Sequence, residues 1–203
     1  MRYGPEQSEK TKQRVVKIAA AQMRKRGPDQ VGVADVMHRA GLTHGGFYAH
    51  FGSKDDLIAA AVGRMFQEAR EMFRGATEGK DRAEGLRSYI NAYVSKSHRD
   101  QPERGCAIAA LSSDIHRQGR KARAAYDEGI AGLVDKITGL LPEQEGADRR
   151  ALAVSMIAEM TGAVAAARAV SNATLSDEIL ASARRSLRAR AGLPPSQHER
   201  QRP

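Results

Sequence analysis

The sequence predicts an all-α protein, and three observations support this fold class. Apolar residues recur at helical spacing along most of the chain, and no segment alternates convincingly with the two-residue period of a strand. Aromatic residues make up only 4% of the 203 residues and Trp is absent, so the core must be built from aliphatic side chains, Ala and Met. Breaks that contain Gly or Pro divide the pattern into about nine helices.

Four helical segments are expected in the N-terminal third of the chain. They cover residues 8–26, 33–40, 44–50 and 53–73. Ser8 is the expected N-cap of the first segment, and Gly41 ends the second. Ser53, with Asp56 three residues later, has the pattern of a capping box and opens the fourth.

Five further helices follow, separated by breaks rich in Gly, Pro, Asp or Ser. They are expected over residues 82–99, 106–117, 119–141, 147–170 and 176–191. The last two are rich in Ala, whose small side chain permits close helix contact. They could therefore form a dimer seam, or simply belong to a monomeric bundle. Residues 192–203 are polar, basic and contain Pro, which predicts a disordered tail.

Positive charge is concentrated at the two ends of the chain. Residues 1–54 hold 10 Lys and Arg against 4 Asp and Glu, and residues 184–203 hold 6 against 1. Residues 55–183 hold 17 against 19 and are close to neutral. The formal net charge of +9 points to a polyanion partner, and this distribution is typical of a nucleic-acid-binding end attached to a body with another role.

Residues 33–57 have the pattern of a helix-turn-helix, in which two short helices flank a turn that contains Gly. Gly41 suits the turn because it accepts a positive φ without steric cost. Thr43 can cap the next helix, whose first turn holds Gly45 and Gly46. Each Gly weakens a helix by about 1 kcal/mol relative to Ala. That cost is understandable if the backbone must come close to something bulky.

The side chains that come after this turn are suited to binding sugar and phosphate. Tyr48 offers a phenol hydroxyl, His50 an imidazole N–H and Lys54 a flexible cation. Phe47 and Phe51 are four residues apart and would form the buried face that holds this helix down.

A family resemblance rests on these residues. Gly41, Leu42-Thr43, Gly45, Tyr48-x-His50-Phe51, Ser53-Lys54 and Leu57 resemble the DNA-binding signature of the TetR/AcrR family of bacterial transcriptional regulators, over about residues 8–65. The chain departs from the signature at Gly32, where a Ser or Thr cap is usual, at Met37, where Ala is common, and at Gly46, where a small hydroxyl residue is frequent. The last departure bears on one DNA contact.

The resemblance implies an all-helical homodimer. It places a three-helix DNA-binding domain at 1–52, a ligand-binding and dimerisation domain at 53–191 and the basic tail at 192–203. The implied DNA contacts, taken with the neighbouring His44, are Thr43, His44, Gly45, Gly46, Tyr48, His50 and Lys54. The implied function is that of a cytoplasmic, nucleoid-associated repressor, which binds a pseudo-palindromic double-stranded operator and is released by a small-molecule effector. Activation instead of repression stays open.

Apolar positions at helical spacing supply candidates for the effector pocket. The residues that we single out are Tyr93, Cys106, Tyr126, Met156, Glu159 and Met160, although apolar positions of this kind are more often ordinary core residues. Cys106 has two interpretations. At the start of a helix and near Arg104 it resembles the thiol of electrophile- or oxidant-responsive family members, but single cysteines are often small buried hydrophobes.

Other classes of protein are disfavoured. We find no paired carboxylates, no nucleophile with a base and no phosphate loop, so an enzyme is not expected, and neither is a cofactor. The single Cys excludes an intramolecular disulfide, and the histidines lack metal-ligand spacing. No apolar run reaches the length of a membrane span or a signal peptide, so no membrane association is expected. A non-selective DNA-compacting protein would also be basic and stays open.

Overall fold

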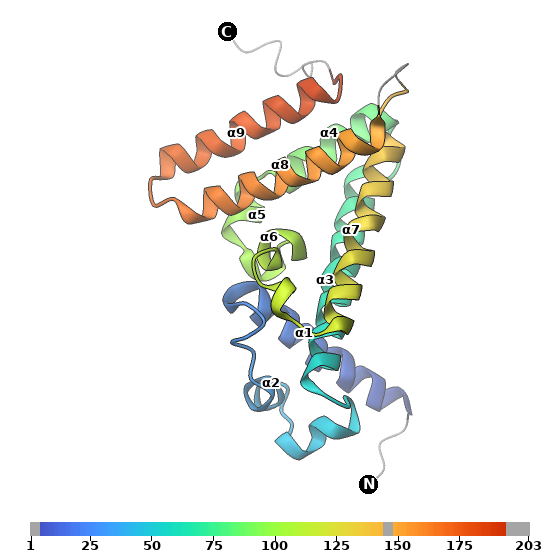
Figure 1. The fold of residues 1–203 in the computed structure, drawn as a ribbon, viewed down its shortest axis with the longest axis vertical. Coiled ribbons are helices and arrows are strands. Elements are labelled where there is room, and N and C mark those ends of the chain that lie inside the picture. The colour runs from blue at the N-terminus through green and yellow to red at the C-terminus, as the bar shows by residue number, and fades with distance from the viewer. Residues whose placement is uncertain (1–4, 144–147, 194–203) are drawn as a thin grey trace. The chain divides into compact units, whose positions relative to one another are not determined.

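The computed structural model describes residues 5–143 and 148–193, and these residues contain nine α-helices, three 3₁₀ helices and no strand (Figure 1). The prediction of an all-α fold is therefore confirmed. The chain divides into two compact units. Unit 1 consists of Met1–Glu71 and Gln101–Ala131, and unit 2 consists of Met72–Asp100 and Gly132–Pro203.

Unit 1 begins with α1 (Pro5–Arg26). The helix starts three residues before Ser8, so Ser8 lies inside it and the prediction that Ser8 caps the helix is wrong. Pro is favoured in a first helical turn because its φ is already helical and it has no N–H to satisfy. The helix ends at Gly27, which has a φ of 79° and donates its N–H to the Met23 carbonyl.

The helix-turn-helix is formed by α2 (Val33–Arg39) and the 3₁₀ helix η1 (His44–Ala49). Gly41 has a φ of 69°, as expected for the turn, and donates its N–H to the His38 carbonyl. Thr43 is the N-cap residue of η1 but makes no side-chain capping hydrogen bond, contrary to the prediction. Ser53 does cap α3 (Lys54–Thr77), because its Oγ accepts from the Asp56 N–H at 3.1 Å.

The rest of unit 1 is made of short segments and the start of a long helix. They are η2 (Pro102–Arg104), α6 (Ala107–Leu111), η3 (Ile115–Arg117) and α7 (Arg120–Leu140), which continues into unit 2. The prediction of one helix over 106–117 is wrong, because α6 ends at Leu111. Ser112 Oγ donates to the Ile108 carbonyl at 2.6 Å, and its hydroxyl also bonds to the Tyr126 hydroxyl at 2.8 Å.

Unit 2 contains α4 (Arg82–Tyr93), α5 (Lys96–Asp100), α8 (Arg149–Ala169) and α9 (Ala173–Arg190). The expected helix over 82–99 is interrupted at Val94, after which Ser95 Oγ accepts from the His98 N–H and starts α5. Asn172 caps α9 three residues earlier than predicted, since its side chain accepts from the Leu175 N–H. Figure 1 shows α8 and α9 packed side by side.

The buried face of α8 contributes much of the core of unit 2. Its buried residues are Ala153, Met156, Ile157, Met160, Ala163, Val164 and Ala167. By length and composition alone α8 could cross a membrane, with a mean hydropathy of 1.3 over its most apolar window, although Glu159 interrupts its apolar run. A buried core helix passes the same test, so this is weak evidence of a membrane span.

The chain turns at Gly192 after α9. Gly192 has a φ of 65°, and Leu193 donates its N–H to the Arg188 carbonyl at 2.9 Å and is buried. The tail predicted for 192–203 otherwise lies outside the described residues.

Candidate nucleic-acid interface

Two stacked phenylalanines fix η1 (His44–Ala49), which we call the recognition segment, to the core of unit 1. Phe47 in η1 is 2% exposed and Phe51 is 4% exposed, and their ring centroids lie 5.4 Å apart. Lys12 of α1 places its Nζ 5.8 Å from the centre of the Phe51 ring. The predicted buried face is therefore confirmed, and it determines which residues of η1 face outward.

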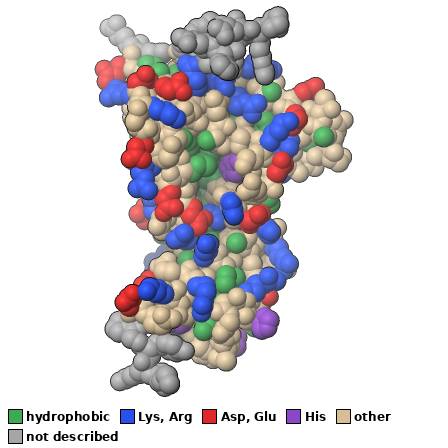
Figure 2. All heavy atoms as spheres, turned by 180° about the vertical axis from the view of Figure 1, so that it is seen from behind, with side chains coloured by type: hydrophobic (Ala, Val, Ile, Leu, Met, Phe, Trp, Pro, Cys, Tyr) green, Lys and Arg blue, Asp and Glu red, His purple; other side chains and the backbone are tan. Residues whose placement is uncertain are grey.

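The outward side of η1 carries an exposed aromatic pair. Tyr48 is 68% exposed, and its ring meets the rings of His44 and Phe47 edge-on, at 6.3 and 5.3 Å between centroids. Figure 2 shows histidine side chains on the surface of the part of unit 1 formed by α2 and η1. An exposed tyrosine held by a buried neighbour can contact a large partner without first being ordered.

The remaining predicted DNA contacts lie close by in the sequence and in unit 1. Thr43, His44 and Gly45 are exposed, Gly46 is half-buried, and His50 is half-buried as the C-cap residue of η1. Lys54 is exposed at the first position of α3.

The fold gives no reason for a glycine at position 45. A Cβ added to Gly45 would meet no atom within 4 Å, and one added to Gly46 would make ordinary contacts of 3.7 Å with Met37 Cε and Thr43 Oγ1. Neither residue has a positive φ. Nothing inside unit 1 therefore requires glycine at position 45, although glycine costs backbone entropy.

A cleft of about 440 Å³ adjoins the recognition segment. Its lining comes from the first half of α1 and from the turn and η1: Gln7, Ser8, Thr11, Arg14, Gly41, Leu42, Thr43, Gly46, Ala49 and His50. Three of the predicted DNA contacts therefore border one cleft. The sequence did not lead us to expect Gln7, Ser8 and Thr11 at this site, although the spacing from 7 through 11 to 14 places polar residues on one face of α1.

A buried ion pair ties α1 to α3 within unit 1. Arg24 donates through Nη2 to Glu68 Oε2 at 2.7 Å and through Nη1 to the Glu103 carbonyl at 3.2 Å. Arg64 donates through Nε to Glu68 Oε1 at 2.8 Å. Burial raises the pKa of Glu68, but the hydrogen bonds from Arg64 and Arg24 outweigh it and the pKa lies below its ordinary value.

A second ion pair fixes the start of α3 to α7. Lys121 Nζ contacts Asp56 Oδ1, and Ser53 Oγ donates to Asp56 Oδ2 at 2.8 Å. These hydrogen bonds, from Lys121 first, lower the pKa of Asp56. Lys54 therefore projects from a helix end that is held at both its cap and its first turn.

Four of the predicted effector-pocket residues lie in unit 2. Tyr93 on α4 is 1% exposed, and its hydroxyl bonds to Thr161 Oγ1 at 3.3 Å. Met156 and Met160 on α8 are buried. The carboxylate of Glu159 accepts from Arg190 of α9 at 2.7 Å, so Glu159 is engaged in an ion pair.

The other two, Cys106 and Tyr126, lie in unit 1. Cys106 is 4% exposed at the start of α6. The Tyr126 ring packs edge-on against Phe66 at 5.7 Å. Burial raises the pKa of Tyr126, the Ser112 hydrogen bond lowers it, and the nearby Cys106 thiol raises it further. Among the described residues no group of three or more His, Cys, Asp or Glu could hold a metal ion.

Comparison with known proteins places this geometry in a family. Residues 15–61, from α1 into α3, match the model of bacterial regulatory proteins of the tetR family. An uncharacterised HTH-type transcriptional regulator of Mycobacterium tuberculosis is 27% identical over 165 residues, which cover 77% of this chain and 84% of that protein. A TetR transcriptional regulator from Chloroflexus aurantiacus has a similar structure, with a TM-score of 0.76, 26% identity, and 90% of this chain and 96% of that one covered. Residues 15–61 thus match the DNA-binding segment of the tetR family, in a chain that has the fold of a TetR transcriptional regulator.

Two further proteins are similar to this chain. The HTH-type transcriptional regulator TtgR of Pseudomonas putida is 28% identical over 86 residues, 42% of this chain and 40% of that protein. The reduced form of NemR from Escherichia coli has the same fold, with a TM-score of 0.74 at 18% identity over 88% of this chain and 96% of that one. TtgR and the Mycobacterium tuberculosis relative are named as transcriptional regulators. The chain is thus a DNA-binding transcriptional regulator, which as a family acts in the cytoplasm.

Proposed function

We propose that this TetR-family protein is a ligand-responsive repressor that binds a pseudo-palindromic operator as a homodimer. The observation that carries the proposal is the outward face of η1, where Tyr48 stands exposed beside two glycines that the fold does not require. Such a face is expected where the backbone of a recognition segment approaches the major groove of DNA closely.

The DNA contacts divide into two groups. His44 and Tyr48 are the residues that reach base edges or stack on sugar, and Gly45 and Gly46 let the backbone come near. The cleft beside η1 receives a phosphate, which Thr43, His50 and Lys54 bind together with Thr11 and Arg14 of α1. Phosphate contacts fix the register of the protein on the duplex, and base contacts supply selectivity.

The homodimer forms through α8 and α9. Val154 on α8 is 50% exposed and Leu175 on α9 is 45% exposed, and they share this part of unit 2 with exposed alanines of α8. Small and apolar exposed residues on a helix pair are suited to packing against a symmetry mate. Twofold symmetry would present two recognition segments to two half-sites, and repression then follows from occupancy of the operator.

The effector is a small molecule with apolar character. In unit 2 the buried Tyr93, Met156 and Met160 are the residues that would line its site, and Glu159 could take part only by leaving Arg190. A second candidate effector is an electrophile or oxidant sensed through Cys106, favoured by the neighbouring Tyr126 hydroxyl.

Operator selection tests the proposal. Fragments of the source genome that bind the full-length protein are selected, and gel shifts then compare the best fragment with random DNA from 50 to 200 mM salt. A repressor keeps its preference at salt concentrations where non-specific binding has disappeared. Equal affinity for both DNAs throughout the series would instead indicate a DNA-compacting protein that coats the nucleoid.

A further inference from the structure

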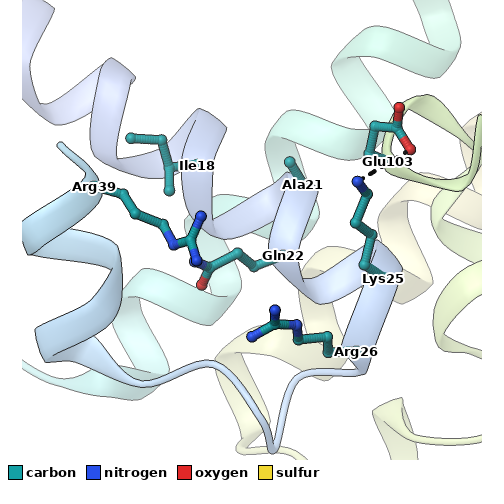
Figure 3. Close-up of a pocket in the computed structure, with 7 residues that line it drawn as sticks. All are labelled: Ile18, Ala21, Gln22, Lys25, Arg26, Arg39 and Glu103. Atoms are coloured by element: carbon teal, nitrogen blue, oxygen red, sulfur yellow. Dashed lines mark ion pairs between the residues drawn. The ribbon is translucent and has the colours of Figure 1, made fainter.

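A second cavity lies in unit 1, away from the proposed DNA contacts. It has a volume of about 510 Å³ and is formed by the second half of α1, α2 and η2 (Figure 3). The residues that line it are Ile18, Ala21, Gln22, Lys25, Arg26, Arg39 and Glu103. None of them lines the cleft beside η1. We call this cavity the α1–α2 groove.

The lining of the α1–α2 groove carries three cations and one anion. Glu103 already faces Lys25, at 3.6 Å between Oε2 and Nζ. Its own backbone N–H, and then Lys25, keep the pKa of Glu103 below its ordinary value, so it stays ionised and paired. Arg26 is exposed and forms no ion pair within the described residues. Asp35 beside the groove pairs with Arg39, so the three cations and these two carboxylates leave a surplus of one positive charge.

Arg39 is held in an orientation suited to binding an anion. Its Nε donates to both carboxylate oxygens of Asp35, at 3.0 and 3.1 Å, and Gln22 Nε2 donates to Asp35 Oδ2 at 2.7 Å. Asp35 thus holds the guanidinium by its inner nitrogen, and the two terminal nitrogens are available for a bidentate contact. Figure 3 shows the Arg39 and Arg26 side chains reaching toward Gln22 from opposite sides.

The other part of the groove is apolar. Ile18 and Ala21 of α1 are half-buried and lie one turn apart on the face that also carries Gln22 and Lys25. A volume of this size is within the range of small-molecule sites, which combine an apolar wall with a few placed polar groups.

We propose that the α1–α2 groove binds a small organic anion, a carboxylate or sulfonate carried on an apolar body. The anionic group lies between Arg39 and Arg26, and the apolar body lies against Ile18 and Ala21. This site is separate from both the DNA contacts and the apolar residues of unit 2 proposed for the effector. Its occupation would neutralise charge beside α2, on the helix that precedes the recognition segment.

Calorimetric titration of the full-length protein with 1-naphthoate tests the proposal, with the neutral 1-naphthamide as the matched ligand. We expect R39Q and A21E each to weaken naphthoate binding about ten-fold or more. R39Q removes a charge-assisted contact to the carboxylate of the ligand, and A21E places a second carboxylate in the groove. R39K keeps the positive charge but lacks the planar guanidinium that can bind both oxygens of an anion. It should therefore weaken naphthoate binding less than R39Q does. Naphthamide should bind weakly and equally to the wild-type protein and to R39Q.

The control variant is K17Q, on an exposed α1 residue that does not line the groove. It should bind naphthoate like the wild-type protein. Arg39 and Asp35 form an exposed ion pair, so R39Q should melt within a few degrees of the wild type. If A21E does not fold, R26Q replaces it.

Two results would overturn the proposal. The first is equal naphthoate affinity in the wild-type protein, R39Q and A21E. Such a result would mean that naphthoate binds outside the groove, for example in unit 2. The second is unchanged naphthoate binding together with lost operator binding in R39Q, which would assign the groove to a DNA phosphate. The titrations contain no DNA, so their outcome does not depend on the proposed repressor function.

Discussion

Arg24 of α1 and Glu68 of α3 form an ion pair of 2.7 Å in which the arginine side chain is only 3% exposed. The two residues are 44 positions apart, and the same guanidinium reaches the Glu103 carbonyl, 79 positions away. The buried guanidinium makes these two contacts through Nη1 and Nη2, while its Nε has no hydrogen-bond partner among the described residues. Arg24 thus couples the position of α1 to that of α3 and η2.

Replacing Arg24 with Met should destabilise the protein by about 2 kcal/mol. Loss of one partner of a fully buried pair costs about 3–5 kcal/mol, but Glu68 is a quarter exposed and keeps Arg64. Chemical denaturation measures the free energy of unfolding. K10M is the control, because the Lys10–Glu6 pair is exposed and should contribute less than about 0.5 kcal/mol. Equal effects of the two substitutions would show that the Arg24 pair is not structural.

The Glu68 pair should make stability depend on pH in the acid range. The pKa of Glu68 is lower in the folded protein than its ordinary value of 4.5. Its contribution is therefore complete above the unfolded pKa and is lost as pH falls through the lower folded pKa. Denaturation of wild-type protein and E68Q from pH 3 to 7 should show a difference that is constant above about pH 5 and shrinks below pH 4.5. A difference that grows on acidification would contradict the assignment.

Local signals in the sequence predicted the recognition segment well. Gly41 has the positive φ that its turn requires, Phe47 stacks on Phe51, and Ser53 caps the helix that follows. Each of these features depends on residues within a few positions of one another. Pattern and propensity are sufficient in such cases, because the competing conformations are also local.

Features that depend on distant partners could not be predicted. The break after Leu111 involves a hydrogen bond between Ser112 and Tyr126, and residues 101–131 join unit 1 through contacts such as Lys121 with Asp56. The α1–α2 groove depends on Arg39 being held beside Gln22, which a helical pattern does not reveal. Periodicity shows which face of a helix is buried, but it does not show against what.

Replacing Gly45 with Ala should separate stability from DNA binding. Gly45 has a negative φ and open space around its Cβ position, so Ala should stabilise the fold by about 0.4–1 kcal/mol through the unfolded state. Operator affinity should fall, since the added methyl group stands where the DNA approaches. Gly41→Ala is the contrasting variant and should destabilise the fold by about 1–2 kcal/mol, because its φ is 69°. Unchanged operator affinity in G45A would argue against close approach.

His50→Ala and Lys54→Ala should lose operator binding while the protein stays folded and dimeric. His50 lines the cleft beside η1, Lys54 is exposed at the start of α3, and neither belongs to the stacked phenylalanine pair. K54A should also reduce the slope of log affinity against log salt by about 1, as loss of one phosphate contact does. Gel shifts across a salt series measure this, with ultracentrifugation and melting as checks. Loss of the dimer in either variant would show that the residue supports the fold or the dimer instead of contacting DNA.

Replacing Cys106 with Ser decides between its two interpretations. The chain has one cysteine, so N-ethylmaleimide modifies a single site, and mass spectrometry can follow its occupancy directly. At 4% exposure Cys106 should react far more slowly in the native protein than in urea. If it is a sensor, an adduct in the crowded space beside Tyr126 should release the wild-type protein from its operator, whereas C106S should bind with wild-type affinity and stay bound. Release of C106S by the same reagent, or full operator binding by the alkylated wild-type protein, would leave Cys106 as a core residue.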